Sequence, residues 1–174
     1  QSRSSAASDV YKRQVMAVPN VFFHDAGPIA RMRPLATGDD GKAVPLEDLD
    51  IDSFGVSTYN QYSWRQLIDG WSCTSCARCQ DVCPAYASGK GLNPMQVIHD
   101  VRNYANDHAP ILLSGGQPDE TILERITEEA VWACTTCNAC VDVCPLYIEH
   151  VPKLTDLRRN AMMETCLLYT SPSP

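Results

Sequence analysis

Hydrophobic residues recur at intervals of three and four positions in four segments of this chain, which is the spacing of one face of an α-helix. The first two segments open with helix-capping signals. Ser63 and Gln66 have capping-box spacing, and Asn93 precedes a proline suited to the first helical position. The apolar positions are Leu67, Ile68 and Trp71, and then Val97, Ile98, Val101, Tyr104 and Ala105. The pattern predicts a helix that runs into Cys73 and a second helix that starts at Pro94.

Two further segments have the same spacing. Thr121 and Glu124 form another capping-box pair, and Pro152 is suited to the start of a last helix. The apolar positions are Ile122, Leu123, Ile126, Ala130 and Val131, and then Leu154, Leu157 and Met162. We therefore predict an unbroken third helix that runs into Cys134. The prolines and glycines of the stretch Asp107–Asp119 predict a loop before it.

The chain before residue 61 has little periodicity. Turn-forming and acidic residues dominate it, among them Gly27, Pro28, Gly41, Pro45, Glu47, Asp48, Asp50 and Asp52. We expect residues 15–60 to be an irregular acidic linker and residues 61–165 to be the helical domain. The longest apolar run in this part of the chain, Val15–Phe23, is far shorter than the roughly eighteen residues that a membrane-spanning helix needs.

Both ends of the chain resemble translated sequencing adapters. The run Ser4–Gln14 ends in the translation of a transposase end used in library preparation, and Cys166–Pro174 begins with the translation of its reverse complement. Such segments are excluded from reasoning about the fold. We expect residues 1–14 and 166–174 to be adapter artefacts, and the natural reading frame to continue in both directions. Cys166 is then no candidate ligand.

The remaining chain is acidic. Without Arg3, Lys12, Arg13 and Asp9, the totals of 14 basic and 21 acidic side chains become 11 and 20, a net charge of about −9. A protein with this balance is poorly suited to bind a phosphate backbone. We therefore expect no nucleic acid among its partners.

Eight of the nine cysteines form two copies of the motif CxxCxxCxxxCP. This run is typical of bacterial [4Fe-4S] proteins, so two copies predict two [4Fe-4S] clusters as cofactors. In two-cluster proteins of this kind, the fourth cysteine of each run ligates the cluster of the other run. We therefore expect Cys73, Cys76, Cys79 and Cys144 to bind cluster 1, and Cys134, Cys137, Cys140 and Cys83 to bind cluster 2.

Structural zinc and disulfides are the alternatives for these cysteines. Zinc is typically held by two CxxC pairs, an arrangement in which the third cysteine and the Cys-Pro pair of each motif have no role. Disulfides are typical of small secreted chains, and cysteines three positions apart on a tight loop are poorly placed to pair. Thiolates kept for iron require a reducing compartment, which places this domain on the cytoplasmic side of a membrane.

The two motifs are 61 positions apart, from Cys73 to Cys134, and helices are predicted between them. In this arrangement Ser63–Thr165 resembles the α-helical ferredoxin domain of succinate dehydrogenase, fumarate reductase and heterodisulfide reductase. The runs WSCTSCARCQDVCPAYASGKGLNP and ACTTCNACVDVCPLYIEHVPKLTDLRR are similar to iron-sulfur oxidoreductases related to heterodisulfide reductase. The resemblance implies a mainly α fold, an α-helical ferredoxin with two [4Fe-4S] clusters, preceded by the irregular linker.

The resemblance also implies a function. Such relatives often carry a haem-binding membrane domain before the ferredoxin and cysteine-rich domains after it, and these are the expected redox partners. We expect an electron-transfer module of a membrane-associated oxidoreductase, with no catalytic residue in this segment. The alternatives are the iron-sulfur subunit of a glycolate- or glycerol-3-phosphate-type dehydrogenase and a non-redox structural metal-binding module. His24, His99, His108 and His150 lack metal-ligand spacing, and we expect His150 to lie near cluster 2.

Overall fold

The chain folds into α-helices joined by short loops. The computed structural model describes residues 3–23, 45, 47, 55–116 and 118–164, and within these ranges it has no β-strand. A 3-10 turn, η3 (Tyr59–Gln61), precedes the helical domain. The helices are α1 (Arg3–Phe22), α2 (Trp64–Ser72), α3 (Arg78–Asp81), α4 (Pro84–Ala87), α5 (Pro94–Leu113), α6 (Ile122–Ile126), α7 (Glu128–Ala133), α8 (Ala139–Asp142) and α9 (His150–Glu164). The predicted mainly α fold is confirmed.

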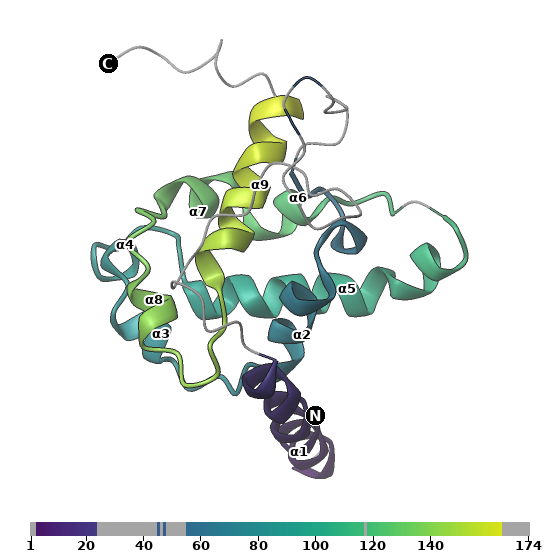
Figure 1. Ribbon diagram of the computed structural model, residues 1–174, viewed down its shortest axis with the longest axis vertical. Helices are drawn as coiled ribbons and strands as arrows, with labels where there is room; N and C mark the ends of the chain where they lie inside the picture. Colours follow the sequence, from purple (N-terminus) through teal and green to yellow (C-terminus); the bar gives the residue numbers. More distant parts are fainter. Residues whose placement is uncertain (1–2, 24–44, 46, 48–54, 117, 165–174) are drawn as a thin grey trace.

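Helix α5 is the centre of the domain, and the short helices α3, α4 and α8 gather at one end of it (Figure 1). The predicted capping signals are present: the Asn93 side chain accepts hydrogen bonds from the first turn of α5, and Ser63 and Gln66 cap α2. The apolar face of α5 is buried and packs against α6 and α9, and Val101, Ile122 and Leu154 belong to one hydrophobic core. Local signals and the apolar pattern therefore define the main helices of this fold.

Helix α5 continues through Pro110 to Leu113, where the sequence predicted a loop. A proline inside a helix removes one backbone hydrogen bond without necessarily ending the helix. Just before this proline, α5 is joined to α6 by an ion pair of 2.7 Å between Asp107 and Arg125. The helix ends at Leu113 and is followed by Gly115, whose φ of +81° is a left-handed conformation that glycine adopts readily.

The predicted third helix is broken into α6 and α7 at Thr127. This residue has a φ of +67°, and its hydroxyl accepts a hydrogen bond from the Ala130 amide at 3.4 Å. A threonine that caps the next helix in this way ends the previous one, because it leaves the helical region of backbone space. The prediction of one unbroken helix was wrong, although both halves bury the expected apolar residues.

The prediction of an irregular linker from residue 15 was wrong for residues 15–22, which are helical. They pack on α2, where the Ser72 hydroxyl donates to the Met16 carbonyl at 2.9 Å and the Asn20 amide donates to Asp69 at 3.1 Å. These tertiary contacts outweigh the weak periodicity of the segment. Residues 24–44, 46 and 48–54 of the predicted linker lie outside the described residues. The adapter origin of residues 1–14 and 166–174 stays a prediction.

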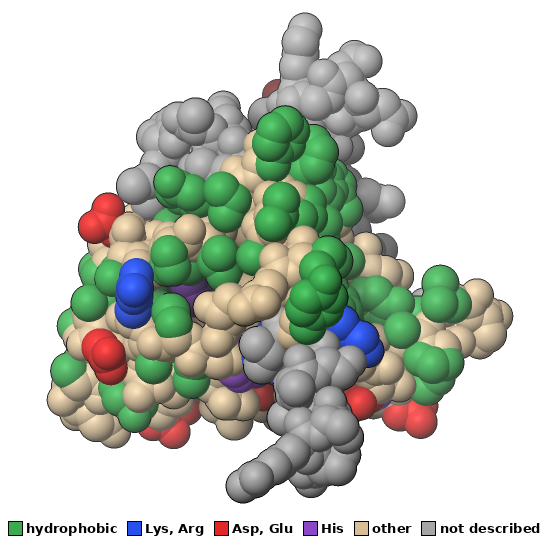
Figure 2. All heavy atoms as spheres, turned by 90° about the horizontal axis from the view of Figure 1, so that it is seen from below, with side chains coloured by type: hydrophobic (Ala, Val, Ile, Leu, Met, Phe, Trp, Pro, Cys, Tyr) green, Lys and Arg blue, Asp and Glu red, His purple; other side chains and the backbone are tan. Residues whose placement is uncertain are grey.

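Aromatic side chains join the end of α1 to α2. The ring of Phe23 meets Phe22 edge-on at 5.2 Å and Trp64 at 6.2 Å between centroids. All three side chains are largely exposed. Figure 2 shows hydrophobic side chains over much of the face seen from below, with acidic and basic side chains scattered among them. Contacts between exposed rings therefore add to the polar contacts that hold α1 in place.

Replacing Gly55 with alanine should destabilise the domain by more than about 1 kcal/mol. Gly55 has a φ of +83°, and a Cβ atom there would lie 2.3 Å from the backbone nitrogen of Asn160 and 2.5 Å from the carbonyl oxygen of Asp156. Gly89 provides the control, because its φ is +79° but a Cβ atom would meet nothing within 4 Å. Thermal unfolding should show a clearly larger loss for Gly55→Ala than for Gly89→Ala. Equal losses would mean that backbone conformation alone sets the cost.

Candidate iron-sulfur site

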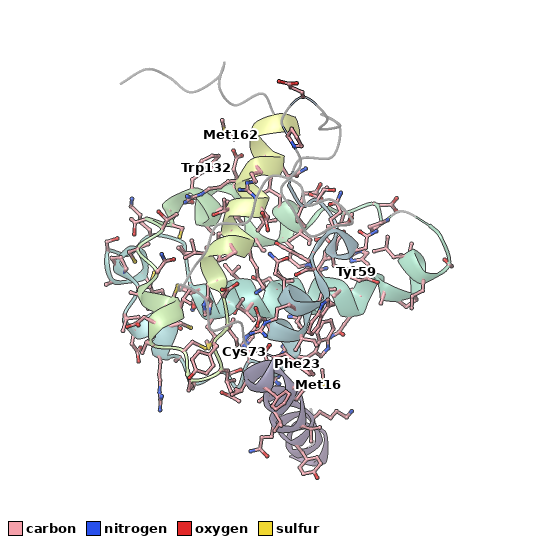
Figure 3. All side chains as sticks on the ribbon, in the orientation of Figure 1. Met16, Phe23, Tyr59, Cys73, Trp132 and Met162 are labelled. Carbon is pink, nitrogen blue, oxygen red and sulfur yellow. The ribbon has the colours of Figure 1, made fainter. Side chains whose placement is uncertain are left out.

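One cavity, here called cavity 1, is lined by the four cysteines predicted to bind cluster 1. It is partly open to solvent, and the space between its walls, including the solvent at its mouth, measures about 320 Å³. Cys73 ends α2, Cys76 and Cys79 follow in the loop and in α3, and Cys144 comes from the loop after α8. Figure 3 shows Cys73 at the end of α2, well apart from Trp132 on α7. Cys144 thus lines the same cavity as three cysteines that precede it by 65 or more positions.

A second cavity, cavity 2, measures about 310 Å³ and is lined by the four cysteines predicted to bind cluster 2. Cys134 ends α7, Cys137 and Cys140 follow, and Cys83 comes from the first motif. The fourth cysteine of each motif therefore lines the cavity of the other motif. Cys79 and Cys140 belong to one apolar cluster with Val151, so the two cavities share a wall.

The two cysteine loops have the same unusual backbone. Ser75 and Ala77 have φ values of +58° and +63°, and the matching Thr136 and Asn138 have +53° and +64°. Non-glycine residues in this region carry strain that is found mostly at functional sites. Each pair of left-handed residues turns its loop so that three cysteines at two-residue gaps face one cavity. The repeat in sequence is thus a repeat in conformation.

The ends of two longer helices separate the cavities. Pro94 at the start of α5 lines cavity 2 and Met95 lines cavity 1. At the start of α9, His150 lines cavity 1 and Val151 lines cavity 2. Both helices therefore direct their N-terminal ends, which carry partial positive charge, toward the cysteines. That orientation favours an anionic group in each cavity.

Burial makes the thiols of these cavities hard to ionise. Burial first, and then the charges of neighbouring thiols, raise the pKa of Cys79 to about 12 and that of Cys140 to about 12. Burial also raises the pKa of Cys73, Cys134 and Cys144. Four thiolates this close together require cations to compensate their charge, and bound iron would supply it. The donor set and the apolar walls therefore fit an iron-sulfur cluster in each cavity.

Backbone amides also point at the sulfurs. The Thr136 amide donates to Cys134 Sγ at 3.4 Å. Amides of Ser75 and Gln80 act in the same way on the first motif, and they oppose the raised pKa of Cys73 and Cys79. Hydrogen bonds of this kind stabilise sulfur that carries negative charge.

The alternatives of disulfides and zinc find no matching geometry among the described residues. None of the eight motif cysteines forms a disulfide. No three His, Cys, Asp or Glu side chains in the described part of the chain converge on the position of one ion. A zinc ion needs its ligands at about 2.0–2.3 Å, which draws them together more closely than a cluster does. The cysteines surround a space, as the ligands of a multi-atom group do.

The histidines are placed differently from the prediction. His150 lines cavity 1, although it follows the second motif in sequence, because α9 begins at the wall between the cavities. His99 on α5 lies near the same cavity, with its Nε2 3.7 Å from Cys73 Sγ and 3.0 Å from Ser75 Oγ. His108 contacts Tyr104 and Glu120 instead, and His24 lies outside the described residues. The separation of a histidine from the two motifs along the sequence therefore does not predict which cavity it lies near.

The same segment matches a known family. A family model described as a 4Fe-4S dicluster domain matches residues 65–145, which contain all eight motif cysteines. This segment is a 4Fe-4S dicluster domain. The cofactors of such a domain are two [4Fe-4S] clusters, and its role is electron transfer. The predicted cofactors and the predicted family resemblance are confirmed.

The chain is similar to part of several longer proteins. The EtfAB:quinone oxidoreductase of Syntrophomonas wolfei is 34% identical over 137 residues, which cover 66% of this chain and 19% of that protein. A protein of Chromohalobacter salexigens named "Probable membrane-anchored ferredoxin" is 34% identical over 148 residues, with 73% and 22% covered. One subunit of the ferredoxin:CoB-CoM heterodisulfide reductase of Methanosarcina mazei is 33% identical over 97 residues, with 55% and 48% covered.

The chain spans about a fifth of the length of the first two relatives and about half of the third. No solved structure matches the chain significantly. In the described part of the dicluster protein, no helix is both long and apolar enough to cross a membrane.

Proposed function

We propose that this chain is the electron-transfer module of a larger iron-sulfur oxidoreductase related to heterodisulfide reductase. The observation that supports this most strongly is the pair of adjoining cavities, each lined by four cysteines from both motifs. Bound there, each [4Fe-4S] cluster would accept and release one electron at a time. The protein's own contribution is to hold both sites close together, to exclude water and to direct amides at the sulfurs.

In this proposal each motif holds three corners of one cluster and one corner of the other. The ligands are Cys73, Cys76, Cys79 and Cys144 in cavity 1, and Cys134, Cys137, Cys140 and Cys83 in cavity 2. Two cysteines of each cavity are buried, one is half-buried and one is exposed, so each site has one corner near solvent. The exposed corners, Cys76 and Cys137, are the points closest to a redox partner. Electrons enter and leave the module most directly there.

The partners in this proposal are other redox domains or subunits of one complex. Support comes from the relatives, since this chain covers only a minor part of the larger ones. One relative is named as a quinone oxidoreductase and another as membrane-anchored. We infer that the module works on the cytoplasmic side of a membrane. In this proposal it exchanges electrons with a haem-binding membrane domain upstream and a cysteine-rich domain downstream.

Metal analysis tests the function directly. Anaerobically reconstituted protein should contain about eight irons and about eight sulfides per chain, and its visible absorbance should bleach with dithionite. Zinc should be absent in stoichiometric amount. A colourless protein that holds zinc and cannot be reduced would show that the site is structural, and the proposal would be abandoned.

A further inference from the structure

The two cavities match in most features that set a cluster's reduction potential. Each has two buried cysteines, one half-buried and one exposed. The charge of Arg102 acts on Cys73 and that of Arg158 on Cys134, and Arg78 also lines cavity 1. Asp69 acts on Cys144, but its carboxylate is paired with Lys153. Solvent access is therefore alike at the two sites, and the additional positive charge at cavity 1 is screened because Arg78 is exposed to solvent.

The cavities also differ in their imidazoles, because the two described histidines that lie near a cavity, His99 and His150, are both at cavity 1. His150 lines this cavity with only 1% of its surface exposed, and its Nδ1 atom is buried with no hydrogen-bond partner among the described residues. His99 Nε2 lies 3.7 Å from Cys73 Sγ. At cavity 2, α9 contributes Val151 and Leu154 in place of a histidine. A buried nitrogen without a partner is costly unless a ligand completes its hydrogen bonding.

We propose that His150 donates a hydrogen bond from Nδ1 to a sulfur of the cluster in cavity 1 and, together with His99, makes that cluster the higher-potential member of the pair. This inference rests on the proposed function, because it requires both clusters. It predicts that the first electron added to the module reduces the cluster in cavity 1.

The direction of the effect follows from charge. Reduction makes a cluster more negative, so a donor to its sulfur stabilises the reduced form and raises the potential. Burial, and then the charge of Lys153, lower the pKa of His150 to about 3, against a smaller effect of the Ile148 backbone. The ring is therefore neutral at neutral pH and carries a single N–H, which the proposal places on Nδ1, whereas the arginines act through their charge.

A redox titration followed by electron paramagnetic resonance tests the proposal on protein that holds both clusters. We expect two one-electron transitions. In His150→Leu the higher of the two potentials should fall by about 59 mV, which is a tenfold change in the equilibrium constant of a one-electron reduction. The lower potential should stay unchanged. His99→Phe should lower the same transition. His150→Gln keeps an N–H donor and should recover most of the shift.

His108→Phe is the matched control, since it removes an imidazole that contacts Tyr104 and Glu120 and lines neither cavity. It should move neither potential. A fall in the lower potential with His150→Leu, or no shift in any variant, would overturn the proposal. If His150→Leu does not fold, pulsed resonance on the wild-type protein decides: coupling to a ¹⁵N-labelled histidine supports the assignment, and its absence refutes it. Protein without iron would instead contradict the proposed function.

Discussion

Replacing Cys83 and Cys137 together with alanine should leave about four irons per chain, whereas replacing Cys83 and Cys79 together should leave almost none. The first pair lines one cavity, so both changes affect the same cluster. The second pair lines two different cavities, so each change removes a ligand from a separate cluster. An uncrossed arrangement predicts the reverse result, because Cys79 and Cys83 belong to one motif.

The comparison of two double variants avoids having to decide which cluster a spectrum reports. Both proteins lack two cysteines and differ only in the second position, so general damage to folding affects them alike. Iron and sulfide content after anaerobic reconstitution is the measurement. Cys166→Ala is the control, because this cysteine lies outside both motifs and its removal should leave about eight irons bound. Four irons in the Cys79 and Cys83 variant would refute the crossed ligands.

Crossing has a structural consequence as well. With crossed ligands, cluster 1 would join the loop before α3 to the loop after α8, and cluster 2 would join the loop before α8 to the segment between α3 and α4. Helices α3 and α8 also contact each other directly. Removal of iron takes away these links and leaves thiols that burial keeps protonated. We therefore expect the packing of its two halves to depend on the metal, whereas α5 retains an apolar core of its own.

Much of this arrangement could be predicted from the sequence because the relevant signals are local. The caps at Ser63 and Asn93 and the periodic apolar residues of α5 are local signals, and the structure confirms them. The spacing of the cysteines is a local signal too, since three thiols two residues apart require one tight loop. The membership of each cavity was expected from the known behaviour of paired motifs.

The features that sequence reasoning missed depend on contacts between distant segments. Helices α6 and α7, on either side of the break at Thr127, pack against α5 and α9 respectively, and residues 15–22 pack against α2. His150 was assigned to the wrong cluster because its place depends on where α9 starts relative to both cavities. The buried pair of Asp69 and Lys153 gave no signal, because its members are 84 positions apart.

That buried pair should be essential for stability. Lys153→Met is expected to lower the free energy of unfolding by about 3–5 kcal/mol, because it leaves the Asp69 carboxylate buried without its cation. The side chains of Lys153 and Asp69 are 0% and 2% exposed and form an ion pair between α9 and α2. Lys153 Nζ also donates to the Glu149 carbonyl at 3.0 Å. The denaturant concentration at which cluster absorbance disappears, recorded without oxygen, measures the loss.

A second replacement separates the unpaired charge from lost packing. If the cost comes from the carboxylate, then adding Asp69→Leu to Lys153→Met should recover much of the stability, since two apolar side chains replace an ion pair at little cost. The Asn20 amide that contacts Asp69 keeps its hydrogen bond of 3.0 Å to the Leu146 carbonyl. Lys90→Met, at an exposed position, should change little. If the unpaired charge is the whole cost, the double variant should not be less stable than Lys153→Met. A less stable double variant would show that the packing of these two side chains between α2 and α9 is needed as well as their charges.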